Sequence, residues 1–261
     1  MANGFIHTTE FLRVLISLLF FLVSSWYDYK FREIPNSVWV LFAPIGFALT
    51  FTQYYAEYIF GGTHIFLYWL LSVGITIAIS FLLFYAGFFG GADAKALICL
   101  SITLPYYPSL SPARFNTKLI IFPLAVLVNA VFASSLLVLF ITSYNLVRYM
   151  QLGGEMFRGF EHEPSWRKII VFMTGIKVRP EKLKNAHYLP LEYHIKRNDG
   201  ITRRLRASPQ IEEDIRIIED FDDEIWATPG LPFLIFITAG FIVALLVGDF
   251  ANWLIELLFS L

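Results

Sequence analysis

Two aspartates, Asp28 and Asp93, are the residues of this sequence best placed to do chemistry. Asp28 closes the first apolar stretch and Asp93 opens the fourth. An ionisable side chain at the end of such a stretch is costly to bury, which makes it a candidate for function. Two carboxyl groups that share a proton can act together, one deprotonating a water molecule while the other protonates a carbonyl oxygen. The pair therefore predicts hydrolysis of an amide bond, with no metal ion and no cofactor.

Each aspartate taken alone also fits a simpler role. Asp28 could pair with Lys30 or Arg32, which follow it closely in the chain. Asp93 could cap the helix that it opens, because a carboxylate is stabilised at the positive end of the helix dipole. Position alone therefore leaves both a catalytic and a structural interpretation open.

The residues around Asp93 favour the catalytic interpretation. Gly90 and Gly91 come shortly before it, and glycine permits close backbone approach and torsion angles that other residues avoid. We expect these two glycines to give an extended substrate access to the carboxyl pair, although an ordinary tight loop has the same composition. Lys95, like the two basic residues after Asp28, could tune the pair or bind lipid headgroups.

The elements that carry the aspartates are expected to be transmembrane helices. Of the 261 residues, 57% are hydrophobic, more than a soluble domain of this length usually carries. About 20 apolar residues are needed to cross a bilayer, and the sequence predicts an α-helical integral membrane protein with six spans: 9–27, 36–56, 64–88, 93–110, 118–145 and 231–260. The fourth begins with charged residues, so we expect it to lie inside the bundle.

The distribution of Lys and Arg predicts the orientation in the cell membrane. Most basic residues fall on one side if the N-terminus is outside, although Arg114 and Lys118 lie on the opposite side. Asp28 and Asp93 then both reach the cytoplasmic face, so we predict an active site that faces the cytoplasm. The net charge of −1 gives no case for nucleic acid, and the single cysteine, Cys99, is interpreted as a packing residue.

A charged segment separates the fifth and sixth spans and divides the chain into three parts. We predict a transmembrane part at 1–145 that carries the aspartates, a small cytoplasmic α+β domain at 146–229, and a last transmembrane helix at 230–261. The inserted segment is too charged to span a membrane and long enough for a small domain.

Three patterns stand out within the inserted segment. Residues 189–197 and 201–206 alternate in polarity around an Asp-Gly pair, which predicts a β-hairpin. Residues 166–178 are apolar enough for either an interfacial helix or a strand. The acidic run 212–224 fits a solvated linker, or a patch that meets the basic tails of a substrate.

Two motifs resemble a known family. Residues 28–36, Asp-Tyr-Lys-Phe-Arg-Glu-Ile-Pro-Asn, are similar to the signature that follows helix one of the type IV prepilin peptidases. Residues 90–95, Gly-Gly-Ala-Asp-Ala-Lys, look like the Gly-x-Gly-Asp-x-Lys motif of the same family. The charged insert and residues 226–233 look like its archaeal branch, the preflagellin (prearchaellin) peptidases. The resemblance covers essentially the whole chain.

The resemblance implies a membrane aspartic protease of the GxGD type, with Asp28 and Asp93 as its catalytic residues. The implied activity is the removal of short, basic leader peptides from archaellin or type IV pilin precursors, after a leader glycine and on the cytoplasmic side. One residue departs from the pattern, because Ala92 stands where the motif has its second glycine. Bacterial relatives often N-methylate their product, and we expect no such second activity here.

Other functions compete with this interpretation. A presenilin-like protease would cut inside a transmembrane helix of its substrate, whereas aspartates near the membrane boundary favour cutting at a leader junction. A proton-coupled transporter could use an intramembrane aspartate, but such proteins often carry inverted repeats, and we find no internal repeat. A non-catalytic scaffold would leave both motifs unexplained. The partners expected are the precursor proteins and membrane lipid.

Overall fold

The protein divides into two compact units that are built from different elements. The computed structural model describes residues 2–111, 120–184, 188–197, 200–206, 223–230, 232–250 and 259. The first unit contains residues 1–134 together with 232–261, and the second contains residues 135–231.

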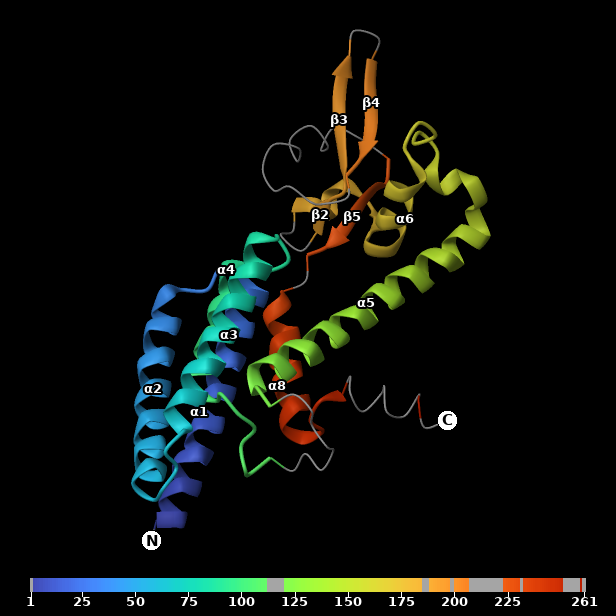
Figure 1. Ribbon diagram of the computed structural model, residues 1–261. Coiled ribbons are helices and arrows are strands. Elements are labelled where there is room, and N and C mark those ends of the chain that lie inside the picture. The colour runs from blue at the N-terminus through green and yellow to red at the C-terminus, as the bar shows by residue number, and fades with distance from the viewer. Residues whose placement is uncertain are drawn as a thin grey trace. The chain divides into compact units, whose positions relative to one another are not determined.

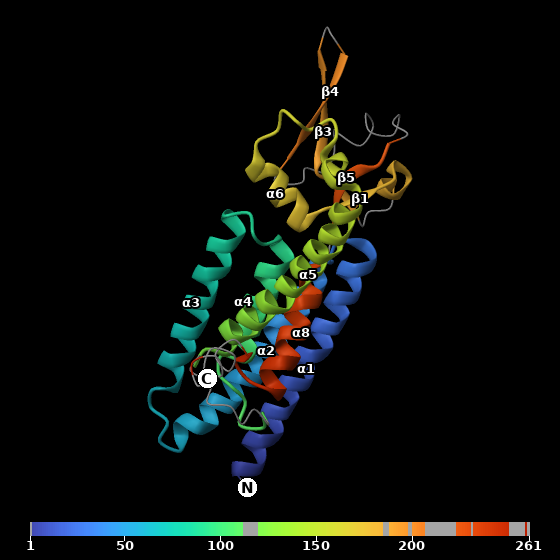
Figure 2. The ribbon, with the colours of Figure 1, turned by 90° about the vertical axis from the view of Figure 1, so that its right-hand side faces the viewer.

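The first unit is a bundle of helices (Figure 1). Its elements are α1 (Ala2–Phe31), α2 (Asn36–Ile59), α3 (Ile65–Tyr85), α4 (Gly91–Thr103), the start of α5 (Phe122–Leu152) and α8 (Phe233–Leu246). Helix α1 packs on α2, and α4 packs on both α2 and α3. Helix α8 lies along α1 (Figure 2) and also contacts α4, so α1, α4 and α8 meet in the interior.

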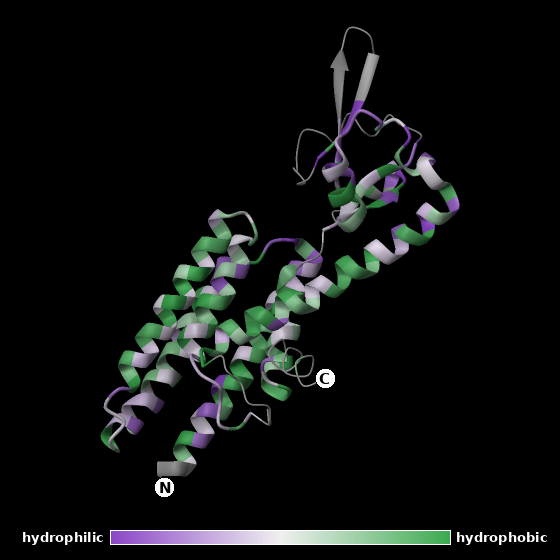
Figure 3. Cartoon of the chain, turned by 45° about the vertical axis from the view of Figure 1, so that its right-hand side comes forward, coloured by the Kyte–Doolittle hydropathy of each residue, from purple (hydrophilic) through white to green (hydrophobic). Residues whose placement is uncertain are grey.

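Helix α3 exposes apolar residues and buries small polar ones, the reverse of the pattern in a soluble helix. In α3, Ser72, Thr76 and Ser80 are buried at four-residue intervals, whereas Leu70 and Leu82 are 70% and 68% exposed. Small and hydroxylated residues let membrane helices pack closely, and apolar residues cover the helices of the chain widely in Figure 3. Helices α1, α2, α3 and α5 are long and apolar enough to cross a membrane. The chain is therefore a membrane protein.

Two helices are shorter than the sequence predicts. Helix α4 has 13 residues and α8 has 14, whereas spans of 93–110 and 231–260 were expected. Residues 231, 251–258 and 260–261 of the last span lie outside the described residues. At 1.5 Å per residue each helix reaches only about 20 Å, less than the roughly 30 Å of a bilayer core. Pro105, which has no backbone N–H to donate, follows the last helical hydrogen bond of α4, from Leu104 to Leu100. Six spans therefore stay a prediction.

Aromatic residues connect the helices of the first unit. Phe21 of α1 meets Phe42 of α2 edge to face, with ring centres 6.2 Å apart, and Phe241 of α8 at 5.2 Å. Phe241 in turn meets Phe122 of α5 at 5.7 Å. All four side chains are fully buried, so one continuous apolar core holds α1, α2, α5 and α8 together.

A buried arginine joins α1 to the end of α4. Arg13 is 3% exposed, and its Nε donates to the carbonyl oxygen of Thr103 at 2.6 Å. Its Nη1 donates to Gln53 of α2 at 2.7 Å, and its guanidinium lies over the Tyr54 ring. The cation therefore meets the carbonyl end of α4, where the helix dipole is negative.

The second unit is a small α/β structure on the end of α5. After η1 (Gly153–Phe157) come α6 (Ser165–Thr174) and η2 (Pro180–Lys184). Strands β1 (Ile176–Val178), β5 (Ile225–Pro229) and β2 (Tyr188–Pro190) form an antiparallel sheet in the order β1-β5-β2. Strands β3 (Glu192–Arg197) and β4 (Gly200–Leu205) pair separately, with Arg197 opposite Gly200.

The strand pattern confirms the predicted hairpin, although its turn residues 198–199 lie outside the described residues. The apolar segment 166–178 is both of the alternatives left open by its sequence, because α6 is followed directly by β1. Of the acidic run 212–224, only the last two residues are described. One of them, Glu224, pairs with Arg148 of α5 at 3.0 Å, which ties the end of that run to the unit.

A buried carboxylate organises the second unit. Glu192 accepts from Arg203 at 2.8 Å and from the backbone N–H of Trp226 at 2.6 Å. Burial raises the pKa of Glu192, and the Arg203 guanidinium opposes that shift. The fully buried Trp226 packs beside it in the apolar core. This carboxylate joins the hairpin to β5, so its role is structural.

The close packing of α8 on α5 predicts a position-specific loss of stability. A Cβ added at Gly240 would lie 2.5 Å from the Val126 carbonyl oxygen and 2.8 Å from the Ala130 nitrogen. Because both are backbone atoms, Gly240→Ala should cost about 1–3 kcal/mol, a fall of roughly 2–12 °C in Tm measured in detergent. Gly74→Ala is the matched control, since nothing lies within 4 Å of that position. An equal Tm for both variants would contradict this packing.

Candidate active site

Asp28 lies in the last turn of α1, where the chain leaves the helix. Arg32 has a left-handed backbone, with φ of 59°, and its N–H still bonds the Asp28 carbonyl at 3.2 Å. A proline fixes φ and disfavours a helical conformation in the residue before it, so Ile34 and Pro35 form a stop between α1 and α2. The sequence motif thus builds a sharp corner directly after Asp28.

The Asp28 carboxylate faces the start of α8. It is half-buried and accepts a hydrogen bond from the backbone N–H of Leu234, and it interacts electrostatically with Arg32. Leu234 is the second residue of α8, so its N–H is one of the donors that a helix N-terminus leaves without an intrahelical partner. A negative charge is favoured at that end of a helix.

Asp93 is nearly buried in the first turn of α4. It is 8% exposed, and its Oδ2 accepts from the backbone N–H of Gly90 at 2.9 Å. A Cβ at Gly90 would lie 3.2 Å from that oxygen, so the backbone comes close to the carboxylate here. Gly90 has an ordinary φ of −75°, and Gly91 is already helical. The left-handed glycine of this loop is Gly87, with φ of 77°.

The structure brings the two motifs together. The Nζ of Lys95 donates to the Oδ1 of Asn36 at 2.8 Å, which joins the end of the first motif to the end of the second. Helices α1 and α4 are in contact, and the charge of Asp28 acts on Asp93. Asn36 does not precede α2 as its cap, since α2 begins at Asn36 itself. Its side chain is instead available to Lys95.

The remaining candidates differ in their relation to the carboxylates. The charge of Arg32 acts on Asp28. Lys30 is exposed, and its ammonium lies over the rings of Trp26 and Phe31 at 5.1 and 5.2 Å. Cations are attracted to aromatic faces, so Lys30 packs on the exposed aromatic rings of α1. Gly91 is exposed, with the Phe84 ring 3.8 Å from an added Cβ.

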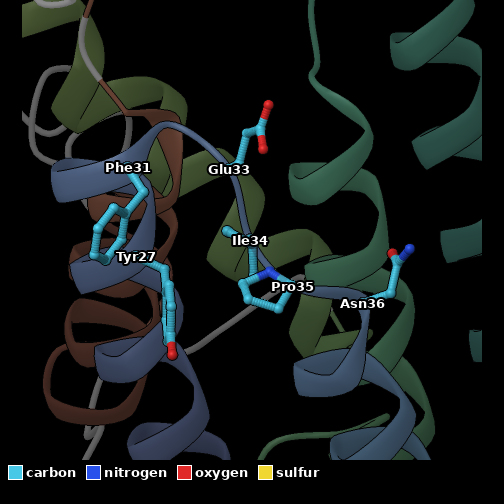
Figure 4. Close-up of a pocket in the computed structure, with 6 residues that line it drawn as sticks. All are labelled: Tyr27, Phe31, Glu33, Ile34, Pro35 and Asn36. Carbon is cyan, nitrogen blue, oxygen red and sulfur yellow. The ribbon is translucent and has the colours of Figure 1, made fainter.

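A hollow of about 430 Å³ lies beside the corner after Asp28. The side chains of Tyr27 and Phe31 project from α1, and that of Glu33 extends outward from the connecting loop (Figure 4). The residues that line it are Tyr27, Phe31, Glu33, Ile34, Pro35 and Asn36. Within the described ranges, no group of three or more His, Cys, Asp or Glu side chains could hold a metal ion. The candidate site thus combines the two carboxylates with the hollow beside the corner after Asp28.

Comparison with known proteins identifies the family. Residues 15–143 match the type IV leader peptidase family, and residues 167–250 match the archaeal peptidase A24 C-terminus type II. The preflagellin peptidase of Methanocaldococcus jannaschii is 28% identical over 90% of this chain and 93% of its own length. Those of Methanococcus voltae and Methanococcus maripaludis are 26% and 24% identical, over 90% of this chain and 94% of theirs. The chain belongs to the type IV leader peptidase family.

Membership of a peptidase family makes the chain a protease, as the two motifs imply. The departure at Ala92 from the family motif has a local explanation. Ala92 is the second residue of α4 and packs, partly buried, against the core. Alanine favours a helix over glycine by about 1 kcal/mol, so the substitution suits the conformation that this position adopts.

Sequence reasoning missed the third helix of the site. Leu234 contributes only a backbone N–H, and no side-chain type marks that role. Ser25 offers one signal, because it precedes Asp28 by three residues and therefore shares its face of α1. Its Oγ contacts Thr238 of α8 at 2.7 Å. A hydroxyl on the aspartate's face of an apolar helix could have indicated a neighbouring helix there.

The two glycines of the second motif should respond differently to substitution. Gly90→Ala would press a methyl group against the Asp93 carboxylate, and a shift of a few tenths of an ångström should lower activity about 3- to 10-fold. Gly91→Ala is the matched control and should stay within about twofold, because its new methyl meets only ordinary contact. The measurement is the initial rate of precursor cleavage by purified protein. Equal rates for the two variants would contradict the tight contact at Gly90.

Proposed function

We propose that the chain is a membrane aspartic endopeptidase that removes the short basic leader peptide from archaellin or type IV pilin-like precursors. The curated relatives are preflagellin peptidases along almost their whole length. The observation that supports the mechanism is the contact between α1 and α4, the helices that carry Asp28 and Asp93, together with the interaction of the two charges. Leader processing is favoured over cleavage inside a membrane helix and over transport, because nothing in the relatives points to either.

The reaction requires one carboxylate and one carboxylic acid. The carboxylate takes a proton from water as the water oxygen attacks the carbonyl carbon of the scissile amide, and the acid gives its proton to the carbonyl oxygen. Return of a proton to the amide nitrogen then breaks the C–N bond. Like charges held close together cannot both ionise easily, so the pair titrates as a unit.

We place six membrane spans in this protein, with the N-terminus outside and the active site at the cytoplasmic face. Helix α4 covers about 20 Å, and a buried non-helical segment continues it, with Leu104 1% exposed. Such backbone is tolerated at membrane depth where protein surrounds it. Arg13 meets Thr103 at one end of the α1–α4 pair, while the charges of Asp28 and Asp93 interact at the other. This antiparallel arrangement fits two spans that cross in opposite directions.

The hollow beside Asp28 is the place that we assign to the substrate. The hollow is open, and the residues that line it are neighbours of Asp28 in the chain. The side chains of Tyr27 and Phe31 give it apolar walls. An extended peptide could lay the residues next to its scissile bond there without any change in the bundle. The exposed carboxylate of Glu33 suits a basic side chain of a leader.

Replacing either aspartate should abolish processing. Asp28→Asn and Asp93→Asn each keep the size of the side chain but cannot exchange the proton, so cleavage should fall at least about 100-fold. The measurement is the fraction of prearchaellin, with its leader, that is processed after co-expression. Asp223→Asn is the control, because this carboxylate is 81% exposed and belongs to the second unit. Full processing by both active-site variants, at normal membrane levels, would sink the proposal.

A further inference from the structure

Helix α8 supplies a backbone donor that reaches Asp28, and two hydroxyl groups fix where that donor lies. The Oγ of Ser25 donates to the carbonyl oxygen of Leu234 at 3.1 Å and contacts the Oγ1 of Thr238 at 2.7 Å. The Thr238 hydroxyl also lies 3.3 Å from the Phe21 carbonyl oxygen. We call Ser25 and Thr238 the hydroxyl pair.

The hydroxyl pair and Asp28 act on the same residue of α8. Ser25 binds the carbonyl of Leu234, while Asp28 accepts from its N–H. Ser25 and Asp28 are three residues apart and share one face of α1. The side chain of Leu234 is also fully buried. Both the carbonyl and the N–H of this residue are therefore held by α1, and the N–H cannot turn away without breaking the part-buried hydrogen bond from Ser25.

The proton count of the hydroxyl pair is consistent with this arrangement. Each hydroxyl has one proton to donate. Thr238 can donate to the Oγ of Ser25, and Ser25 can then donate to Leu234, which satisfies both of the shorter contacts. A buried hydroxyl that loses its partner costs about 1–3 kcal/mol, so each member depends on the other.

We propose that Ser25 and Thr238 are positioning residues, which hold the Leu234 N–H against Asp28 and so keep this carboxylate ionised as the base that deprotonates water. This inference rests on the proposed function. Asp93 is then the acid, since it is nearly buried and its oxygen accepts from Gly90 alone among the described hydrogen bonds. The charges that act on Asp28 among the described residues are Arg32, in the corner just after α1, and Asp93 on α4.

The test compares Ser25→Ala, Thr238→Val and Thr238→Ser in purified protein with a leader-bearing precursor. The first two variants remove one hydroxyl each, so kcat should fall about 5- to 20-fold with little change in KM. Because Asp28 loses an N–H donor, the acid limb of the kcat profile should move up by about 0.5–1 pH unit. Thr238→Ser keeps the hydroxyl and should stay within about twofold of the parent.

Thr52→Val is the matched control. Its hydroxyl bonds only the Leu49 carbonyl of its own helix, at 3.0 Å and in an exposed position. It should therefore leave kcat and the pH profile unchanged. The Tm of every variant is measured alongside, and Ser25→Ala offers a second route if Thr238→Val fails to fold.

Two results would overturn the positioning role. One is a folded Ser25→Ala or Thr238→Val with the parent's kcat and pH profile. The other is a fall in kcat that leaves the acid limb in place, since a merely loosened bundle would do the same. Asp28→Asn in the same assay distinguishes failure of the proposed function from failure of the positioning role. If Asp28→Asn cleaves normally, the proposed function fails. If Asp28→Asn is inactive but Thr238→Val is normal, only the positioning role fails.

Discussion

The packing of α1 against α4 is the constraint on which the site depends, because Asp28 and Asp93 belong to different helices. No local sequence feature can bring their carboxylates together, so helix contacts must do it. The two helices are tied at both ends. Arg13 donates to the Thr103 carbonyl at one end. At the other end Lys95 donates to Asn36, and the charge of Asp28 acts on Asp93. Sliding one helix along the other would break both ends at once.

The way in which α4 is held explains how a short helix can carry a catalytic group. Its N-terminus holds Asp93 through the Gly90 N–H, and its C-terminus is met by the Arg13 cation and the Thr50 hydroxyl. Gly46 of α2 allows this approach, because an added Cβ there would collide with the Thr103 side chain. A buried cation that loses its partners is strongly destabilising. The buried polar side chains of Arg13 and Thr50 thus fix the position of the helix that bears Asp93.

Much of the site could be predicted from the sequence, because its motifs are local. The corner at Ile34–Pro35, the close approach of Gly90 to Asp93, and the hairpin of the inserted segment all follow from neighbouring residues. The contacts of Arg13 and Ser25 could not be predicted, since each partner lies on another helix and a hydroxyl or guanidinium does not specify which carbonyl it meets. Gly90 does not use the conformational freedom of glycine, because the helix begins one residue later and needs only an extended residue before it.

If Asp28 and Asp93 titrate as one pair, one of them carries a proton near neutral pH. The most direct measurement is infrared spectroscopy of the purified protein, which detects the carbonyl stretch of a protonated carboxyl group. We expect a band at neutral pH that is lost in Asp93→Asn. Because a neighbouring negative charge holds the proton on Asp93, the pH at which the band disappears should fall in Asp28→Asn. A band that survives Asp93→Asn, or a midpoint that Asp28→Asn leaves unchanged, would contradict the pair.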